Sequence, residues 1–143
     1  MNSFCADLHI HTVLSPCGDL DMSPLQIVDK AIEKGLDIIA ITDHNHTGNC
    51  KVTRELGKRK GLWVVYGVEV TSREDVHCLV FFDNDEQLHL FQEFIDQVMS
   101  NIANDTSLFG HQLIVDAEER ILEEITHSLY PGLNVGIVDI LAK

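Results

Sequence analysis

The sequence predicts an α/β domain with a largely parallel sheet, and two kinds of segment support this. Residues 36–42 form a nearly continuous apolar run of strand length, which is typical of a strand buried on both faces. Residues 85–103 carry apolar side chains every three or four positions, which is typical of an amphipathic helix. Because such segments alternate along 143 residues, of which 45% are hydrophobic, we expect one domain over 1–143.

The remaining elements follow from turn and capping residues. Ser23 and Pro24 mark a helix start, because serine caps the first turn and proline suits the first helical position, and Gly35 ends that helix. Residues 72–75 form a short polar connection, so the runs on either side of it should pair like a hairpin. In chain order we expect strands over 3–10, 36–42, 62–71 and 76–82, and helices over 24–34, 49–60, 85–103 and 116–129, with a loop over 104–110 and a last helix beginning within 134–143.

The charge of the chain restricts its partners. A formal charge of −13 would repel a phosphate backbone, and no basic cluster is larger than the stretch from Lys51 to Lys60, so no basic nucleic-acid-binding patch is expected. The chain has no apolar run of about 18 residues and no signal-like N-terminus, so we expect a soluble cytoplasmic protein without membrane contact. Its four cysteines lie far apart, which indicates neither a disulfide framework nor a zinc ribbon.

Potential metal ligands cluster where the expected strands end. In an extended strand Asp7, His9 and His11 share one face. A metal cation can satisfy two imidazoles and a carboxylate together. The alternative to a metal site is an ordinary polar face in contact with solvent. A second cluster, Asp-His-Asn-His at 43–46, follows the next strand, and Glu69 lies in the one after it. Because parallel strands end at the same edge of a sheet, these groups should converge there.

Four segments resemble the first motifs of the PHP (polymerase and histidinol phosphatase) domain family in both order and spacing. They are Asp7-Leu8-His9-Ile10-His11-Thr12, Ile41-Thr42-Asp43-His44-Asn45, Gly67-Val68-Glu69-Val70 and Val76-His77-Cys78-Leu79. The resemblance spans residues 4 to about 83. It implies a distorted seven-stranded β/α (TIM-like) barrel, two or three divalent metal ions at its C-terminal mouth, and hydrolysis of a small phosphorylated substrate or nucleotide.

The resemblance also implies roles for individual residues. The metal ligands would be His9, His11, His44, Glu69 and His77, with Cys17 or Asp19 from the following loop as a further ligand. Glu69 would bridge two ions, and Glu69 and His44 would be the catalytic residues. Imidazole and carboxylate ligands suit Zn, Mn or Fe better than Mg or Ca, and a pair of such ions can activate water and clamp phosphoryl oxygens. No Ser/His/Asp triad is apparent, so nucleophilic catalysis by a side chain is not indicated.

Two acidic residues of these motifs are expected to act indirectly. Asp7 and Asp43 would orient neighbouring histidines by accepting their second ring N–H rather than bind the metal themselves. His46 is expected to be a solvated loop residue. The remaining histidines, which lie outside the motifs and are expected on the surface, are His89, His111 and His127.

Glu69 and His77 each have a purely structural alternative. Glu69 could form an ion pair with Arg54 or Arg73, and His77 could be a hydrogen-bonded histidine of the core. At the level of function, the leading hypothesis is a metal-dependent phosphoesterase. The alternative is a non-catalytic metal-binding or regulatory module that keeps only the first motifs.

A complete barrel of this kind runs to roughly 200 residues or more, and the family's later motifs supply further ligands that we do not find here. We therefore expect an incomplete domain, the N-terminal portion of a PHP barrel. Half a barrel leaves a strand edge and one face of an apolar sheet exposed. We expect a truncated sequence, a self-association that covers the edge, or a natural fragment whose last helices close the opening, and we expect weakened hydrolysis.

Overall fold

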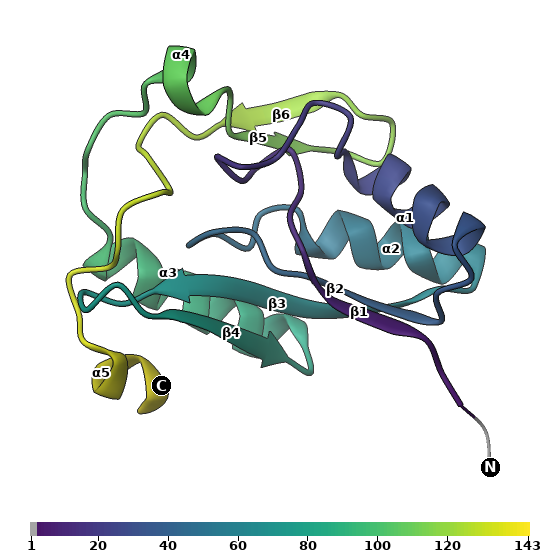
Figure 1. Cartoon of the computed structure of the whole chain (residues 1–143), viewed down its shortest axis with the longest axis horizontal. Coiled ribbons are helices and arrows are strands. Elements are labelled where there is room, and N and C mark those ends of the chain that lie inside the picture. The colour runs from purple at the N-terminus through teal and green to yellow at the C-terminus, as the bar shows by residue number, and fades with distance from the viewer. Residues whose placement is uncertain (1–2) are drawn as a thin grey trace.

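Four strands form the main sheet of the computed structural model, which describes residues 3–143 (Figure 1). They are β1 (Ala6–Ile10), β2 (Ile38–Ile41), β3 (Trp63–Thr71) and β4 (His77–Phe82), side by side in that order. The first three run parallel, with Ile39 paired to Val64, whereas β4 pairs antiparallel with β3 and places Leu79 opposite Glu69. The predicted mixed α/β class and the predicted hairpin are therefore confirmed, although β1 begins at Ala6 rather than at residue 3.

Three helices share one hydrophobic core with this sheet. They are α1 (Pro24–Glu33), α2 (Cys50–Lys60) and α3 (Asp85–Val98). As predicted, Ser23 caps α1, where its side chain accepts a hydrogen bond from the backbone N–H of Gln26. Buried side chains of all three helices pack with the even-numbered side chains of β3, which are Val64, Tyr66, Val68 and Val70. Because side chains alternate along a strand, Glu69 faces the opposite side of the sheet.

A small antiparallel sheet takes the place of the helix that the sequence predicts over 116–129. Its strands are β5 (Leu113–Val115) and β6 (Ile121–Glu124). In the turn between them the Asp116 carboxylate accepts the backbone N–H of Arg120, and Glu119 has a φ of 63°. A helix cannot contain a residue of positive φ, and a local aspartate hydrogen bond competes with helical pairing. The helical prediction was therefore wrong.

The C-terminal part differs from the prediction in two smaller respects. Helix α3 ends at Val98 instead of continuing to residue 103, because Met99 has an extended backbone while its N–H still bonds to the carbonyl of Ile95. The predicted loop over 104–110 contains a short helix, α4 (Thr106–Phe109), which Asp105 caps. Helix α5 (Ile137–Leu141) confirms the predicted last helix, and its Ile140 joins the main core.

The face of the main sheet opposite the helices is partly exposed. Leu79 and Phe81 pair with Glu69 and Gly67, so they lie on this face, and both are exposed. Strands β1 and β4 are the two edges, and residues 3–143 form an open sheet rather than a closed barrel. None of the helices described in this part of the chain is long and apolar enough to cross a membrane.

Candidate metal centre

Four histidines and one glutamate meet at one edge of the main sheet. His9 lies in β1 and His11 directly after it, His44 follows β2, Glu69 lies in β3, and His77 begins β4. An isolated bridge between His44 and Glu69 extends the parallel ladder beyond β2 and sets these two residues side by side. Residues that the chain separates by up to 68 positions (77 minus 9) are therefore neighbours in the fold.

The carboxylate of Glu69 is the centre of this cluster. Its Oε2 lies 2.7 Å from His9 Nε2, 3.0 Å from His11 Nε2 and 3.8 Å from His44 Nδ1. Its Oε1 lies 2.6 Å from His77 Nδ1. Two groups of three side chains, His9/His11/Glu69 and His44/Glu69/His77, each hold their ligand atoms within 4.8 Å of one another. Glu69 belongs to both groups, which is the position of a carboxylate that could bridge two cations.

The structural alternative for Glu69 does not fit its surroundings. Neither arginine considered as its partner pairs with it: Arg54 lies over the ring of Tyr66, and Arg73 has Glu74 as its neighbour. Glu69 is 5% exposed, and a buried carboxylate requires compensation by charge or hydrogen bonding. The imidazoles around it supply that compensation in the described part of the chain.

The cluster has an open side and a buried side. The side chains of His9 and His77 are 50% and 51% exposed, whereas those of His11 and His44 are 15% exposed. His77 is thus not a core histidine. The imidazole rings form a continuous row, with centroids 5.0 Å apart for His9 and His11, 4.6 Å for His11 and His44, and 5.8 Å for His44 and His77. A molecule from solvent can therefore approach at both ends of the row.

The hydrogen bonds of His11 indicate which of its nitrogens is free to bind a cation. The hydroxyl of Ser15 donates to Asp43 Oδ1 at 2.7 Å, so the contact of 3.0 Å between His11 Nδ1 and Ser15 Oγ requires Nδ1 to carry the hydrogen. The Nε2 lone pair then faces Glu69 Oε2. Two acceptors at 3.0 Å repel each other unless a cation or a proton lies between them.

Two of the distances among these atoms suit shared coordination. Donors that each lie about 2.1 Å from one cation are separated by about 3 to 3.5 Å. The contacts of Glu69 Oε2 with His11 and His44, 3.0 Å and 3.8 Å, lie near this range, whereas His9 and His77, at 2.7 Å and 2.6 Å, hydrogen-bond to the carboxylate directly. Four imidazoles and one carboxylate form a donor set that Zn, Mn and Fe accept. The residues present therefore fit a divalent metal centre.

Burial keeps the inner histidines neutral. Burial, together with the neighbouring His44, lowers the pKa of His11 to about 4, and burial also lowers the pKa of His44. Burial alone would raise the pKa of Glu69, but hydrogen bonds from His9 and His77 hold it below its ordinary value. At neutral pH the site thus offers the unprotonated imidazoles of His11 and His44 beside an ionised carboxylate, which is the form that metal binding requires.

Asp43 supports the cluster by a different route from the one predicted. Its buried carboxylate does not contact the ring of His44; it accepts hydrogen bonds from the backbone N–H and the hydroxyl of Thr12 and from Ser15. Ser15 Oγ in turn contacts His11 Nδ1 and accepts the backbone N–H of His44. Burial raises the pKa of Asp43 to about 6, against the effect of these hydrogen bonds. Asp43 therefore orients His11 through Ser15.

The loop after β1 brings one of its two candidate ligands to the site. Both are exposed, but only Cys17 forms a group with His11 and His44 whose ligand atoms lie within 4.8 Å of one another, and Asp19 belongs to no such group among residues 3–143. Gly18 makes this loop conformation possible, because a Cβ there would lie 2.0 Å from the carbonyl oxygen of Thr12. Burial raises the pKa of the Cys17 thiol, so metal binding there would have to displace its proton.

The other polar residues singled out in the motifs stay outside the cluster. The Asp7 carboxylate accepts the backbone N–H of His9 at 3.2 Å and bonds to no imidazole in the described chain. The pairing of β1 with β2 shifts its register between Asp7 and Ile10, and such an irregularity disrupts the simple alternation of side chains. His46 is not solvated as expected: it is half-buried, its Nδ1 accepts the N–H of Gly48, and burial lowers its pKa to about 4.

The surface histidines behave differently from one another. His89 and His111 are exposed and pair with Glu93 and Glu124, respectively, as expected for surface residues. His127 is half-buried, and its backbone bridges to that of Ala103. None of the three belongs to a group of possible metal ligands in the described chain.

Three supporting residues were missed from the sequence, namely Ser15, Asn45 and Asn49. Asn45 has a φ of 49°, and its buried amide accepts the N–H of Thr71 and donates to the carbonyl of Leu129. The buried amide of Asn49 donates to Thr12 Oγ1 and to the carbonyl of Leu113. A serine or an asparagine in a turn is ordinary, so only the cluster of Asn45 and Asn49 next to a ligand-rich motif could have drawn attention to them.

Comparison with known proteins relates this geometry to other molecules. Over 66 residues the chain is 36% identical to the phosphoribosyl 1,2-cyclic phosphate 1,2-diphosphodiesterase of Eggerthella lenta, covering 46% of this chain and 24% of that protein. It is 32% identical over 76 residues to the 3',5'-nucleoside bisphosphate phosphatase of Chromobacterium violaceum, covering 51% and 26%. A crystal structure from Bifidobacterium adolescentis, assigned by inference as a metal-dependent phosphoesterase, superposes with a TM-score of 0.55 at 29% identity, covering 68% and 34%.

These matches extend over only part of each relative, between about a quarter and a third of its length. The model of the PHP domain, in contrast, matches residues 7–135 of this chain. This range contains every residue of the histidine and glutamate cluster. The resemblance drawn from four short motifs is thus confirmed over most of the sequence, and the chain belongs to the PHP domain family.

Proposed function

We propose that this chain is a metal-dependent phosphoesterase domain that hydrolyses a small phosphorylated substrate. The observation that carries the proposal is the position of Glu69, whose two carboxylate oxygens contact different histidines, His9 and His11 on one side and His77 on the other. One carboxylate between two sets of imidazoles is the arrangement that two adjacent cations need.

The proposed ligands divide between two positions. His9, His11 and Glu69 would hold one ion, and His44, Glu69 and His77 would hold the other, with Cys17 near His11 and His44 as a further donor. When bound, divalent ions lower the pKa of water and neutralise charge on phosphoryl oxygens. The mixed nitrogen and oxygen donors favour Zn, Mn or Fe.

The charges of the site favour an anionic substrate although the whole chain carries a formal charge of −13. The ligand set contains the neutral imidazoles of His11 and His44 and one ionised carboxylate, that of Glu69. A single carboxylate cannot neutralise divalent cations, so the loaded site would present positive charge to a phosphate group. The exposed sides of His9 and His77 would leave room for the substrate to approach from solvent.

Hydrogen bonds within the protein orient the two inner histidines of the site. Asp43 and Ser15 fix the ring of His11 so that Nε2, not Nδ1, faces the reaction site. His44 is held by its backbone, because its N–H donates to Ser15 and its neighbour Asn45 bonds to the backbone of Glu69. We propose that Glu69 and His44 lie closest to the reacting phosphoryl group.

The substrate class follows from the relatives and remains part of the proposal. One relative carries the name of a cyclic phosphate diphosphodiesterase and another that of a nucleoside bisphosphate phosphatase. Both names describe small molecules with phosphate groups on a sugar. We propose a substrate of this kind, and we further propose that the parallel strands β1 to β3 form one side of a TIM-like β/α barrel.

The test begins with protein purified without chelators. Its metal content is measured by mass spectrometry, and phosphate release is followed with added Mn²⁺ on nucleotides, on a nucleoside bisphosphate and on a generic aryl phosphate. We expect two or more equivalents of metal and a turnover that His9→Ala abolishes. The matched control is His89→Ala, because His89 is exposed on α3 and lies outside the ligand groups.

Each result has a definite consequence. Turnover that survives in His9→Ala would contradict the assignment of this cluster as the catalytic site. One equivalent of metal without turnover would favour the alternative of a non-catalytic metal-binding or regulatory module. If the protein binds no metal, and alanine at His9, His11 and His44 leaves its stability unchanged, both functions are excluded.

A further inference from the structure

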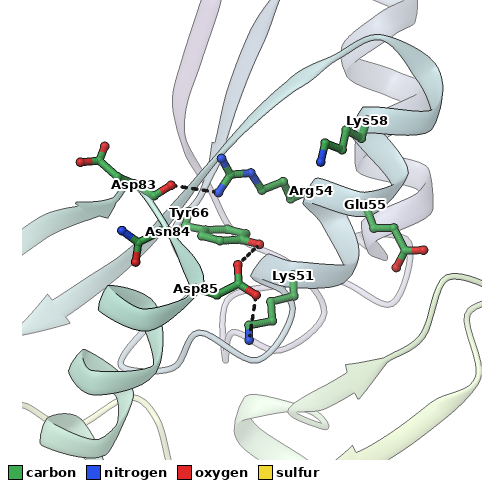
Figure 2. A pocket seen from close by; sticks show the side chains of 8 residues that line it. All are labelled: Lys51, Arg54, Glu55, Lys58, Tyr66, Asp83, Asn84 and Asp85. Carbon is green, nitrogen blue, oxygen red and sulfur yellow. Dashed lines mark hydrogen bonds and ion pairs between the residues drawn. The ribbon is translucent and has the colours of Figure 1, made fainter.

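A depression lined by three basic and three acidic side chains lies on the face of the sheet opposite the metal cluster. It has a volume of about 510 Å³ and is formed by α2, β3 and the start of α3 (Figure 2). Tyr66 forms part of its wall and belongs to the helix-covered face of β3, whereas Glu69 points to the other face. The depression is therefore separated from the histidines by the thickness of the sheet.

Helix α2 supplies the three cations of this depression. Lys51, Arg54 and Lys58 line it, and the last two are four residues apart, so they lie on the same side of the helix. Arg54 is held in place, because its guanidinium carbon lies 4.2 Å from the centre of the Tyr66 ring and its Nη1 donates to the carbonyl oxygen of Asp83 at 3.4 Å. Figure 2 shows the side chains of Lys58 and Arg54 both extending from α2 in the same general direction.

The carboxylates around the depression are already engaged or turned away. Asp85 accepts the hydroxyl of Tyr66 at 2.9 Å and pairs with Lys51 at 3.2 Å. Glu55 points away from Arg54 (Figure 2) and pairs with Arg59. The carboxylate of Asp83 likewise points outward, and only its backbone carbonyl faces Arg54 (Figure 2).

Two cations consequently remain without a carboxylate partner among residues 3–143. Arg54 and Lys58 form no ion pair there, although the chain carries 23 acidic residues and 10 basic ones. Arg54 is half-buried, and its planar fork of N–H donors is stacked on an aromatic ring, which reduces the entropy lost when it binds an anion. A guanidinium and an ammonium that line the same depression suit an anion with several oxygens and more than one charge.

We propose that this depression binds a phosphate group, either as free phosphate or as part of a phosphate monoester. The site is distinct from the metal centre and uses Arg54 and Lys58 as its charged donors. Its volume exceeds that of a single phosphate ion, so a monoester fits as well. Because Arg54 covers the ring of Tyr66, the site recognises the phosphate group and not a stacked base.

The experiment measures binding of inorganic phosphate and of adenosine monophosphate by calorimetry at constant ionic strength. The protein is treated with chelator first, so that no metal binds phosphate at the other face. We expect saturable binding of one equivalent, which Arg54→Gln and Lys58→Gln each weaken by about tenfold or more, since both remove a charge-assisted hydrogen bond. Circular dichroism verifies that each variant is folded, and the exposed Lys58 provides a second test should Arg54→Gln disturb packing on Tyr66.

Two control variants place the binding site. Lys34→Gln removes the same charge at the end of α1, outside the depression, and should leave the affinity within about twofold of the original, because salt screens distant charges. Glu69→Gln should leave phosphate binding unchanged. Tighter binding of the monoester than of free phosphate would identify an ester as the ligand, and the reverse would identify the free ion. Absent binding, equal weakening by Lys34→Gln, or loss of binding in Glu69→Gln would each overturn the proposal.

Discussion

Replacing Glu69 by glutamine separates the metal-centre hypothesis from a purely structural role. The substitution keeps the shape of the side chain and removes the charge that contacts His9, His11 and His77. In the presence of chelator the change should be small, within about 1 kcal/mol of the free energy of unfolding, because His9 and His77 are half-exposed and such pairs contribute little. With metal the difference should be much larger.

The magnitude with metal follows from ligand linkage. An ion at a hundred times its dissociation constant stabilises the folded state by about 2.7 kcal/mol per site. Because Glu69 belongs to both ligand groups, Glu69→Gln should lose most of this stabilisation at both positions, about 5 kcal/mol in total. Urea unfolding with chelator and with Mn²⁺ measures the effect. Glu123→Gln on β6 is the matched control, since this glutamate is exposed and belongs to no ligand group among residues 3–143.

One result would refute the reasoning. If Mn²⁺ stabilises Glu69→Gln as much as it stabilises the original protein, the two ligand groups do not share this carboxylate, and the ion binds elsewhere. An equal loss of stabilisation in Glu123→Gln would mean that the effect reflects overall charge rather than coordination.

Three further predictions concern the surroundings of the site and the rest of the sheet. Ser15→Ala removes the hydroxyl that His11, Asp43 and the backbone of His44 share. The free energy of unfolding, measured with urea, should fall by about 1 to 3 kcal/mol, and metal titration should show binding weakened by about tenfold to a hundredfold. Unchanged values would contradict the orienting role of Ser15. Burial and the hydrogen bond to Asp85 raise the pKa of Tyr66, so its contribution to stability is present below about pH 10 and is lost as the pH rises towards the raised value. Over this alkaline range the unfolding midpoint of Tyr66→Phe should vary less than that of the original protein. The same pH profile for both proteins would argue against the raised pKa. The exposed edge strand β4 should support self-association, which light scattering detects. Replacing Leu79 and Phe81 by lysine should abolish this association. If the unsubstituted protein is already a monomer, the prediction is contradicted.

Local sequence patterns were sufficient for most of the main sheet. The run of apolar residues in β2, the serine cap of α1 and the polar connection between β3 and β4 each depend on neighbours in the sequence, and each appears in the structure. The ligand types could be named for the same reason, since a strand that ends in histidines is visible without knowledge of its partners. What the sequence could not supply was the distance between them.

The sequence did not predict the small sheet of β5 and β6, because residues that hydrogen-bond to β5 are far away in the chain. Apolar residues at 121, 122 and 125 have the spacing of a helix, but Ile121 and Leu122 are exposed, so they provide no core for one. The side chain of Asn49 accepts the N–H of Val115 and donates to the carbonyl of Leu113, and thereby acts as a strand partner for β5. A side-chain amide that bonds to backbone 64 and 66 residues away leaves no local pattern.

The sequence by itself determined the chemistry of this protein: imidazoles and carboxylates at the ends of apolar strands, in an acidic chain with one basic helix. Only the tertiary structure decided how these groups are used. Asp7 bonds to the backbone of His9, Asp43 acts through Ser15, and alternation along β3 sets Glu69 among the histidines and Tyr66 under Arg54 on the other face. The reason is physical, because residue type fixes what a side chain can bind, whereas strand register and burial fix which atoms come within reach of one another.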